Sequence, residues 1–193
     1  MTIYKIKGFY DQKKPDREAA LEAYRAIIAE NQGEDTLNAL AFLAADYAHP
    51  EALSLLFDAG VSPKITNSNR ATLLDILAKQ PGIRRYSYIE PLPSGAVAAA
   101  VNLLLDKNVD ALNTEHFSDK RTCYHYAALK GKVEFVEALA KRGVRLDLSD
   151  RTGNNAVQII NKQKQKAGAK LLEDYFRLAK IFAEAGVDSG TYI

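Results

Sequence analysis

Two stretches of the chain share one pattern of residues: residues 43–60 are LAADYAHPEALSLLFDAG and residues 126–143 are YAALKGKVEFVEALAKRG. Each has a pair of alanines, then apolar residues at helical spacing, and then a glycine. Shorter stretches with the same ending are VNLLLDKNVD at residues 101–110 and LAKIFAEAGVD at residues 178–188. An internal repeat of this kind predicts similar units stacked in a row, because one unit is too small to bury its own apolar face.

The register of the repeats is regular. Ala39 precedes Gly60 by the same number of residues as Thr122 precedes Gly143, and these positions mark the start of a first helix and the loop after a second helix. Longer intervals elsewhere indicate insertions between the first and second helices of two units, at about residues 79–95 and 161–170.

The best-matching unit is TCYHYAA at residues 122–128, followed by Gly131, Glu134, Val136 and Gly143, and it resembles the ankyrin repeat. The resemblance covers about residues 34–188. It implies an all-α fold, an ankyrin-repeat solenoid of stacked helix-turn-helix pairs with short β-hairpin-like fingers between them.

We therefore expect one ankyrin-repeat domain over residues 1–193. An amphipathic helix with Asp16 as its N-cap would cover the N-terminal end of the stack. Its expected buried residues are Ala20, Leu21, Tyr24 and Ile28. The predicted parts are an N-terminal extension and capping helix (1–33, with residues 1–10 extended and residues 15–32 helical), repeats at 34–66, 67–113, 114–148 and 149–188, and one long last helix at 170–185.

The residues that end the second helices support this register. Gly60, Gly143 and Gly186 follow the apolar runs, where a helix commonly ends in a left-handed residue. Asn108 takes this position in the second repeat, and asparagine is among the few other residues that adopt a left-handed conformation. We expect these four residues to have positive φ angles.

Composition excludes several protein classes. The chain has 26 Lys+Arg and 24 Asp+Glu, and its formal net charge of +2 is too balanced for a surface that follows a polyanion throughout. The longest uncharged apolar stretch, residues 95–105, is about half as long as a membrane span needs. The N-terminus shows no signal-peptide core, and the single Cys123 excludes an internal disulfide. We expect a cytoplasmic monomer with no membrane partner.

No glycine-rich phosphate loop, nucleophile elbow, dinucleotide fingerprint or metal-ligand motif occurs in the sequence. We therefore expect no enzymatic activity, no cofactor and no metal ion. His125 and His49 align with ankyrin-repeat histidines that support helix ends, so we interpret both as structural; Phe42 and Asp75 stand at the His125 position of the first two repeats. Cys123 replaces the usual proline, and we interpret it as a small buried residue, with a reactive helix-terminal thiol as the alternative.

The resemblance also implies a function. Ankyrin repeats bind partner proteins through their finger tips and the exposed face of each first helix, so we expect a scaffold or regulator that binds another protein on this concave face. The corresponding positions are Asp46, Tyr47, Ser68, Asn69, Ser118, Asp119, Arg121, Leu129, Lys130, Arg151, Thr152 and Asn154, together with Ala71.

Two other hypotheses stay open. Both insertions would project from one edge, where basic and aromatic residues would bind an acidic or phosphorylated ligand or, less favoured, nucleic acid. A third hypothesis is an enzyme built around His125. The residues of the alternative edge are Arg84, Arg85, Tyr86, Tyr88, Lys162, Lys164 and Lys166.

Overall fold

The computed structural model describes residues 3–12, 15–30, 33–79, 92–112, 118–164 and 167–188. Within these ranges the protein is all α, with ten helices and no strand. The helices are α1 (Ile3–Tyr10), α2 (Arg17–Ala29), α3 (Glu34–Asp46), α4 (Pro50–Asp58), α5 (Leu73–Lys79), α6 (Ala96–Asp106), α7 (Cys123–Leu129), α8 (Val133–Lys141), α9 (Ala156–Gln163) and α10 (Ala169–Glu184).

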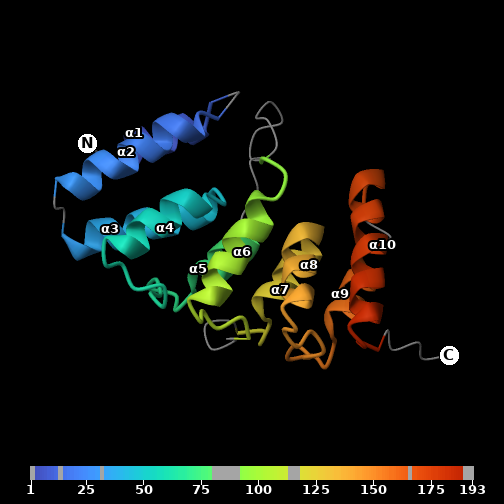
Figure 1. Cartoon of the computed structure of the whole chain (residues 1–193). Helices are drawn as coiled ribbons and strands as arrows, with labels where there is room; N and C mark the ends of the chain where they lie inside the picture. The colour runs from blue at the N-terminus through green and yellow to red at the C-terminus, as the bar shows by residue number, and fades with distance from the viewer. Residues whose placement is uncertain are drawn as a thin grey trace.

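The helices lie in two rows (Figure 1). In the first row α3, α5, α7 and α9 are successive neighbours, and in the second row α2, α4, α6, α8 and α10 are successive neighbours. Helices α3 and α4, α5 and α6, α7 and α8, and α9 and α10 also pack in pairs across the rows, and α1 packs against α2. Each of the four predicted repeats contains one such pair.

Small residues let the rows approach each other closely. The alanine pairs of α3 and α7 are fully buried, as the sequence pattern predicted, and none of the four has a side chain beyond Cβ to hold the neighbouring helix away. The second row contributes larger apolar side chains to the same continuous core. Fully buried examples are Leu53, Leu56, Phe135 and Leu139.

Three first-row helices begin with reciprocal hydrogen bonds between the N-cap residue and the third helical residue. At α5, the Thr72 N–H donates to Asp75 Oδ2 at 2.8 Å and the Asp75 N–H donates to Thr72 Oγ1 at 3.2 Å. At α9, the Asn155 N–H donates to Gln158 Oε1 at 2.9 Å and the Gln158 N–H donates to Asn155 Oδ1 at 3.0 Å. Helix α7 begins in the same way at Thr122. These bonds satisfy backbone donors that a helix start otherwise leaves without acceptors.

The left-handed residues after the second helices are where the sequence predicts them. Gly60, Gly143 and Gly186 have φ angles of 97°, 68° and 76°, and Asn108 has a φ angle of 57°. The predicted positive φ angles are therefore confirmed at these four helix ends.

The prediction of β-hairpin-like fingers was wrong, because no described residue forms a strand. Each described finger is a tight turn closed by a backbone bond: the Asn67 N–H donates to the Ala71 oxygen at 3.1 Å, and the Asp150 N–H donates to the Asn154 oxygen at 2.8 Å. One such bond does not make the ladder that defines a strand.

The N-terminal segment also differs from its prediction. Residues expected to be extended form helix α1, because Ile3, Ile6, Phe9 and Tyr10 recur at helical spacing and line one face. Ile6 and Tyr10 are buried in the main core, and the other two pack against it.

Helix α2 begins as predicted, with Asp16 Oδ1 accepting the N–H of Ala19 at 2.8 Å. Its buried face is rotated slightly from the predicted one, since Leu21 and Ile28 are only partly buried. The fully buried residues of α2 are Ala20, Ala23, Tyr24 and Ile27.

At the C-terminal end the second insertion is shorter than predicted, because its first residues continue α9 to Gln163. The long last helix is confirmed as α10. Its Tyr175 and Phe182 are buried, whereas Phe176 is 59% exposed. Of the first insertion, residues 80–91 lie outside the described residues.

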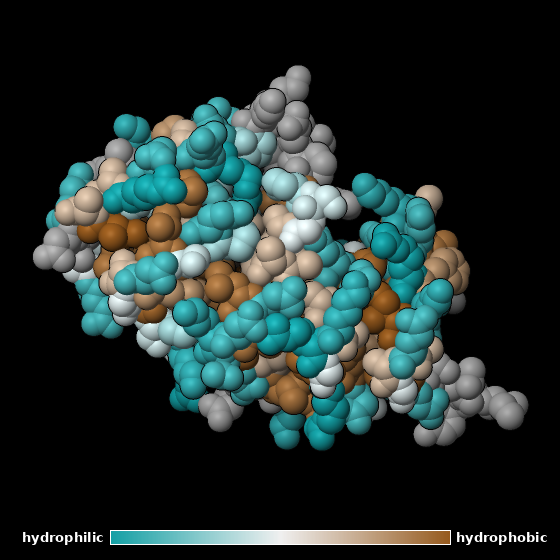
Figure 2. Space-filling model, viewed as in Figure 1, coloured by the Kyte–Doolittle hydropathy of each residue, from teal (hydrophilic) through white to brown (hydrophobic). Residues whose placement is uncertain are grey.

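The surface is mixed in character. Figure 2 shows hydrophilic side chains in rows over the helices, with hydrophobic side chains visible between them. Over the described ranges, no helix combines the length and the apolar character that crossing a membrane requires.

The finger turns supply a test of the fold. Arg70 has a φ angle of 58° at the position where the fourth repeat has Gly153, whose φ angle is 79°. A left-handed conformation costs a non-glycine residue about 1–2 kcal/mol. We expect Arg70→Gly to be more stable than Arg70→Ala by about 1 kcal/mol in the free energy of unfolding. Thermal unfolding followed by circular dichroism should therefore give Arg70→Gly the higher melting temperature. Equal stability of the two variants would contradict the turn geometry.

Candidate functional site

The predicted groove residues lie at the ends of first-row helices and in the turns that precede them. Ala71 is an exception to the predicted accessibility, because it is only 5% exposed and packs inside the turn. The other predicted groove residues are exposed or partly buried. The exposed ones are Ser68, Asn69, Ser118, Lys130, Arg151 and Thr152, and the partly buried ones are Asp46, Tyr47, Asp119, Arg121, Leu129 and Asn154.

Side chains of the third finger and α7 are joined to α5. The Tyr126 hydroxyl donates to Asp119, with distances of 3.0 Å to Oδ1 and 2.9 Å to Oδ2. The Lys79 ammonium lies over the Tyr126 ring, 4.5 Å from its centroid. The sequence analysis missed Tyr126 and Lys79, although Tyr126 lies between His125 and the alanine pair of α7 and is partly exposed. These contacts fix the third finger to two helices.

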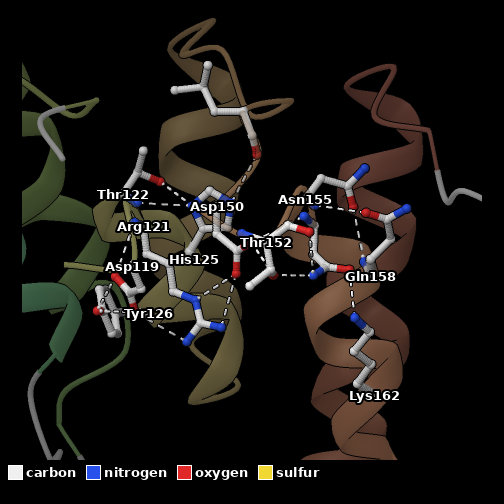
Figure 3. Close-up of polar contacts among 12 residues, drawn as sticks. Asp119, Arg121, Thr122, His125, Tyr126, Asp150, Thr152, Asn155, Gln158 and Lys162 are labelled. Carbon is white, nitrogen blue, oxygen red and sulfur yellow. Dashed lines mark hydrogen bonds and ion pairs between the residues drawn. The ribbon is translucent and has the colours of Figure 1, made fainter. Parts of the chain in front are cut away.

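The fourth finger is organised around Asp150, whose side chain is 2% exposed. Arg121 donates to Asp150 Oδ2 from Nε at 3.2 Å and from Nη2 at 3.1 Å (Figure 3). Asp150 Oδ1 accepts from the backbone of Thr152 at 2.9 Å and of Asn154 at 3.2 Å. Burial acts to raise the pKa of Asp150, but these hydrogen bonds outweigh it and hold the pKa below its usual value. The sequence analysis named Arg121 and missed Asp150.

Lys162 belongs to this surface and not to the predicted alternative edge. Its ammonium donates to Asn154 Oδ1 at 2.7 Å, which ties α9 to the fourth finger (Figure 3). Arg151 links the two fingers, with its N–H donating to the Asp119 oxygen at 2.7 Å and its Nη1 donating to the Ser118 oxygen at 3.4 Å. One chain of contacts therefore runs from α5 across α7 to α9.

Lys164 is the one described residue of the alternative edge that does not join this network. Its ammonium lies 4.9 Å from the centroid of the exposed Phe176 ring on α10. The structure therefore separates Lys164 from Lys162. The other predicted residues of that edge lie outside the described residues; they are Arg84, Arg85, Tyr86, Tyr88 and Lys166.

At the N-terminal end of the face, Tyr47 is covered by α1. The rings of Tyr10 and Tyr47 are stacked at 4.1 Å between centroids with a 9° interplanar angle. The Tyr47 hydroxyl donates to Asp11 Oδ1 at 2.6 Å. Tyr47 is thus held between parts of its own chain, which the expectation of an extended N-terminus did not foresee.

Lys132 is a partly buried lysine that the sequence analysis did not single out. Its ammonium donates to the Leu77 oxygen of α5 at 2.9 Å. Burial, together with the charge of Lys130, lowers the pKa of Lys132 to about 7, against the opposing effect of Asp46. Burial is the larger of the two causes, and the charge of Lys130 adds to it.

His125 supports the start of α7, as the sequence predicted. Its Nδ1 accepts the Thr122 N–H at 3.0 Å, so Nε2 carries the proton that is donated to the Leu148 oxygen at 3.0 Å. Burial lowers the pKa of His125 to about 4. Both ring nitrogens are engaged by the backbone, and this arrangement gives no support to an enzyme built around His125.

His49 and Cys123 are also structural in their contacts. The His49 ring is hydrogen-bonded to the Tyr10 hydroxyl, and burial, followed by the charge of Arg17, lowers its pKa to about 3. Cys123 is 1% exposed, and burial raises the pKa of its thiol well above the usual value. This confirms the interpretation of Cys123 as a small buried residue. His116 lies outside the described residues.

In the part of the chain that the structure describes, no three His, Cys, Asp or Glu side chains form a group that could hold a metal ion. Comparison of the chain with models of known protein families gives no match, and comparison with curated proteins finds no similar sequence.

The His125 cap generates a prediction about acid sensitivity. Because its folded pKa of about 4 lies below the ordinary value of 6.5, the unfolded state binds more protons between these pH values. The free energy of unfolding therefore falls as the pH drops through this interval. His125→Gln should keep the cap, as Gln158 does in α9. The free energy of unfolding, measured with urea, should therefore decrease less for this variant than for the unaltered protein between about pH 7 and 5. An equal decrease in both proteins would contradict this role.

The Arg121 and Asp150 pair generates a second prediction. Arg121→Gln leaves a buried carboxylate without its cation, so we expect the free energy of unfolding at neutral pH to fall by about 1–3 kcal/mol. Because the pKa of Asp150 is lowered on folding, the difference should shrink as the pH falls below about 4.

The matched control is Arg145→Gln, which removes an exposed ion pair with Asp147, 3.1 Å long. We expect that change to cost less than about 0.5 kcal/mol. If the two variants lose equal stability in chemical unfolding, Arg121 does not anchor the fourth finger.

Proposed function

We propose that this chain is an ankyrin-type repeat protein and acts as a non-enzymatic scaffold or regulator. In this proposal a partner protein binds the face formed by the first-row helices and the fingers before them. Four features support the repeat assignment: the two rows of helices, the paired packing, the recurring caps at the starts of α5, α7 and α9, and the left-handed residues at the helix ends.

The observation that carries the binding proposal is the continuous network of side chains from Lys79 to Lys162. It crosses three first-row helices and two fingers. Contacts between different elements join Lys79 to Tyr126, Tyr126 to Asp119, Arg121 to Asp150 and Asn154 to Lys162. Contacts within each finger connect Asp119 to Arg121 and Asp150 to Asn154. Side chains that are already fixed lose less entropy when a partner binds. A pre-organised polar surface of this kind is what a binding face of a repeat protein requires.

The second row differs in its construction. One surface ion pair of the second row, Arg142 Nη2 with Asp106 Oδ1 at 2.6 Å, joins the ends of α6 and α8. Others, such as Lys141 with Glu137 at 2.9 Å and Lys180 with Glu184 at 3.9 Å, lie within one helix, and exposed pairs of either kind contribute little to a rigid surface. We therefore place the partner on the first-row face.

The test is site-directed photocrosslinking in the cells that produce the protein. Benzoylphenylalanine replaces one exposed residue at a time, either Asn69 or Lys130 on the first-row face, or Glu137 or Lys141 on the second row. We expect a crosslinked adduct of one defined mass from the first-row positions, because the partner covers them. Mass spectrometry of the adduct identifies the partner.

The four replacements are matched in that each changes an exposed or partly exposed side chain at a helix surface or turn. Adducts from the second-row positions alone, or equal labelling of both faces, would show that the first-row face is not the binding surface.

A further inference from the structure

The charges at the C-terminal half of the first-row face are unevenly compensated. Four cations lie there: Arg121 and Lys130 from α7 and its finger, and Arg151 and Lys162 from α9 and its finger. Of the nearby carboxylates, Asp119 and Asp150 are both bound by Arg121, and Asp150 is almost fully buried. A third, Asp174 of α10, lies beside Gly131, next to Lys130. Within the described residues, the side chains of Arg151 and Lys162 bond to neutral oxygens and not to a carboxylate.

Two of these cations are positioned by neutral oxygens. The Arg151 guanidinium donates to the backbone oxygen of Ser118, and the Lys162 ammonium donates to the side-chain oxygen of Asn154. A carbonyl oxygen orients a cation without cancelling its charge. Exchanging it for a carboxylate keeps the hydrogen bond from the cation and adds the attraction between opposite charges.

Lys130 adds to this surface from the end of α7. Its side chain is exposed, and its charge reaches the ammonium of the neighbouring Lys132. The chain as a whole has a formal net charge of only +2, so this excess of positive charge is local. Electrostatic complementarity of this kind selects a partner and speeds its approach.

We propose that Lys130, Arg151 and Lys162 bind an acidic segment of the partner protein, rich in Asp or Glu side chains. This inference rests on the proposed function, since it names the chemistry of the partner that the first-row face would take. A protein segment is favoured over nucleic acid because it can place neutral residues opposite Asp46 and Asp119, which stay partly exposed on the same face, whereas a phosphate backbone carries a charge at every nucleotide.

The probe for this proposal is a fluorescein-labelled peptide of ten glutamates, titrated with the full chain and followed by fluorescence anisotropy. We expect saturable binding at about 50 mM salt that weakens at about 300 mM salt. Arg151→Gln with Lys162→Gln should weaken binding about tenfold, because two cations at the centre of the surface are removed.

The matched control is Lys107→Gln with Lys141→Gln, which removes two exposed cations at the ends of second-row helices. We expect it to change the affinity by less than about twofold. Lys130→Gln changes one exposed side chain and should weaken binding about threefold, so the proposal is testable even if the double variant does not fold.

Three results would overturn the proposal: no binding at low salt, equal losses in the double variant and its control, or tighter binding of a ten-nucleotide thymidine oligomer than of the peptide. If the peptide fails while photocrosslinks still form at Asn69 and Lys130, the acidic partner is wrong and the binding face stands. If crosslinks form only on the second row, the binding face itself is wrong.

Discussion

A helix of seven residues has almost no stability of its own in water, and both α5 and α7 are that short. The protein depends on compensating for this constraint in two ways. The reciprocal caps satisfy the backbone donors at each helix start, and neighbouring helices on both sides bury the apolar face. The fingers extend from these caps, so the position of every polar group on the first-row face depends on them.

Three different residues perform this capping at equivalent positions. Asp75, His125 and Gln158 each accept the N–H of their N-cap residue, with distances between 2.8 and 3.0 Å. The carboxylate, imidazole and amide share one property, an acceptor atom at the right distance from the backbone. The start of α3 was predicted wrongly: the helix begins at Glu34 and not at Ala39, so Phe42, which aligns with these three residues, lies inside it. Helix α3 has no side-chain cap, but it is 13 residues long and has Glu34 in its first turn to favour the helix dipole.

Much of the fold was predictable because its signals are local in sequence. The left-handed glycines and Asn108 follow directly from the end of each apolar run. Helix α1 was missed because its four apolar residues are spaced over only eight positions, too few to distinguish a helix from a strand without knowing what packs against them. The stacking of Tyr10 on Tyr47 joins residues far apart in the sequence, and no spacing rule indicates it.

The candidate site was predictable only as a set of positions. Arg121 and Arg151 were identified as surface positions, but the pairing of Arg121 with Asp150 depends on how one repeat stacks on the next. Lys162 was assigned to the wrong edge because the sequence shows a run of lysines and not the helix that continues through it. The helices are thus predictable from the local sequence, whereas the surface contacts depend on how neighbouring helix pairs pack and are not.

In the proposed complex, stability and binding depend on different cations of the same face. Arg121 is committed to a buried carboxylate, so exchanging its partner would expose an uncompensated charge and cost several kcal/mol. Arg151 and Lys162 are held by carbonyl oxygens that can return to water at little cost when a stronger acceptor arrives. Exchange of these acceptors breaks the side-chain contacts of Arg151 with Ser118 and of Lys162 with Asn154. It leaves in place the Arg121–Asp150 pair and the bond from the Arg151 backbone N–H to the Asp119 oxygen, which hold the two fingers together. For this reason we propose that the acidic partner binds Lys130, Arg151 and Lys162 and not Arg121.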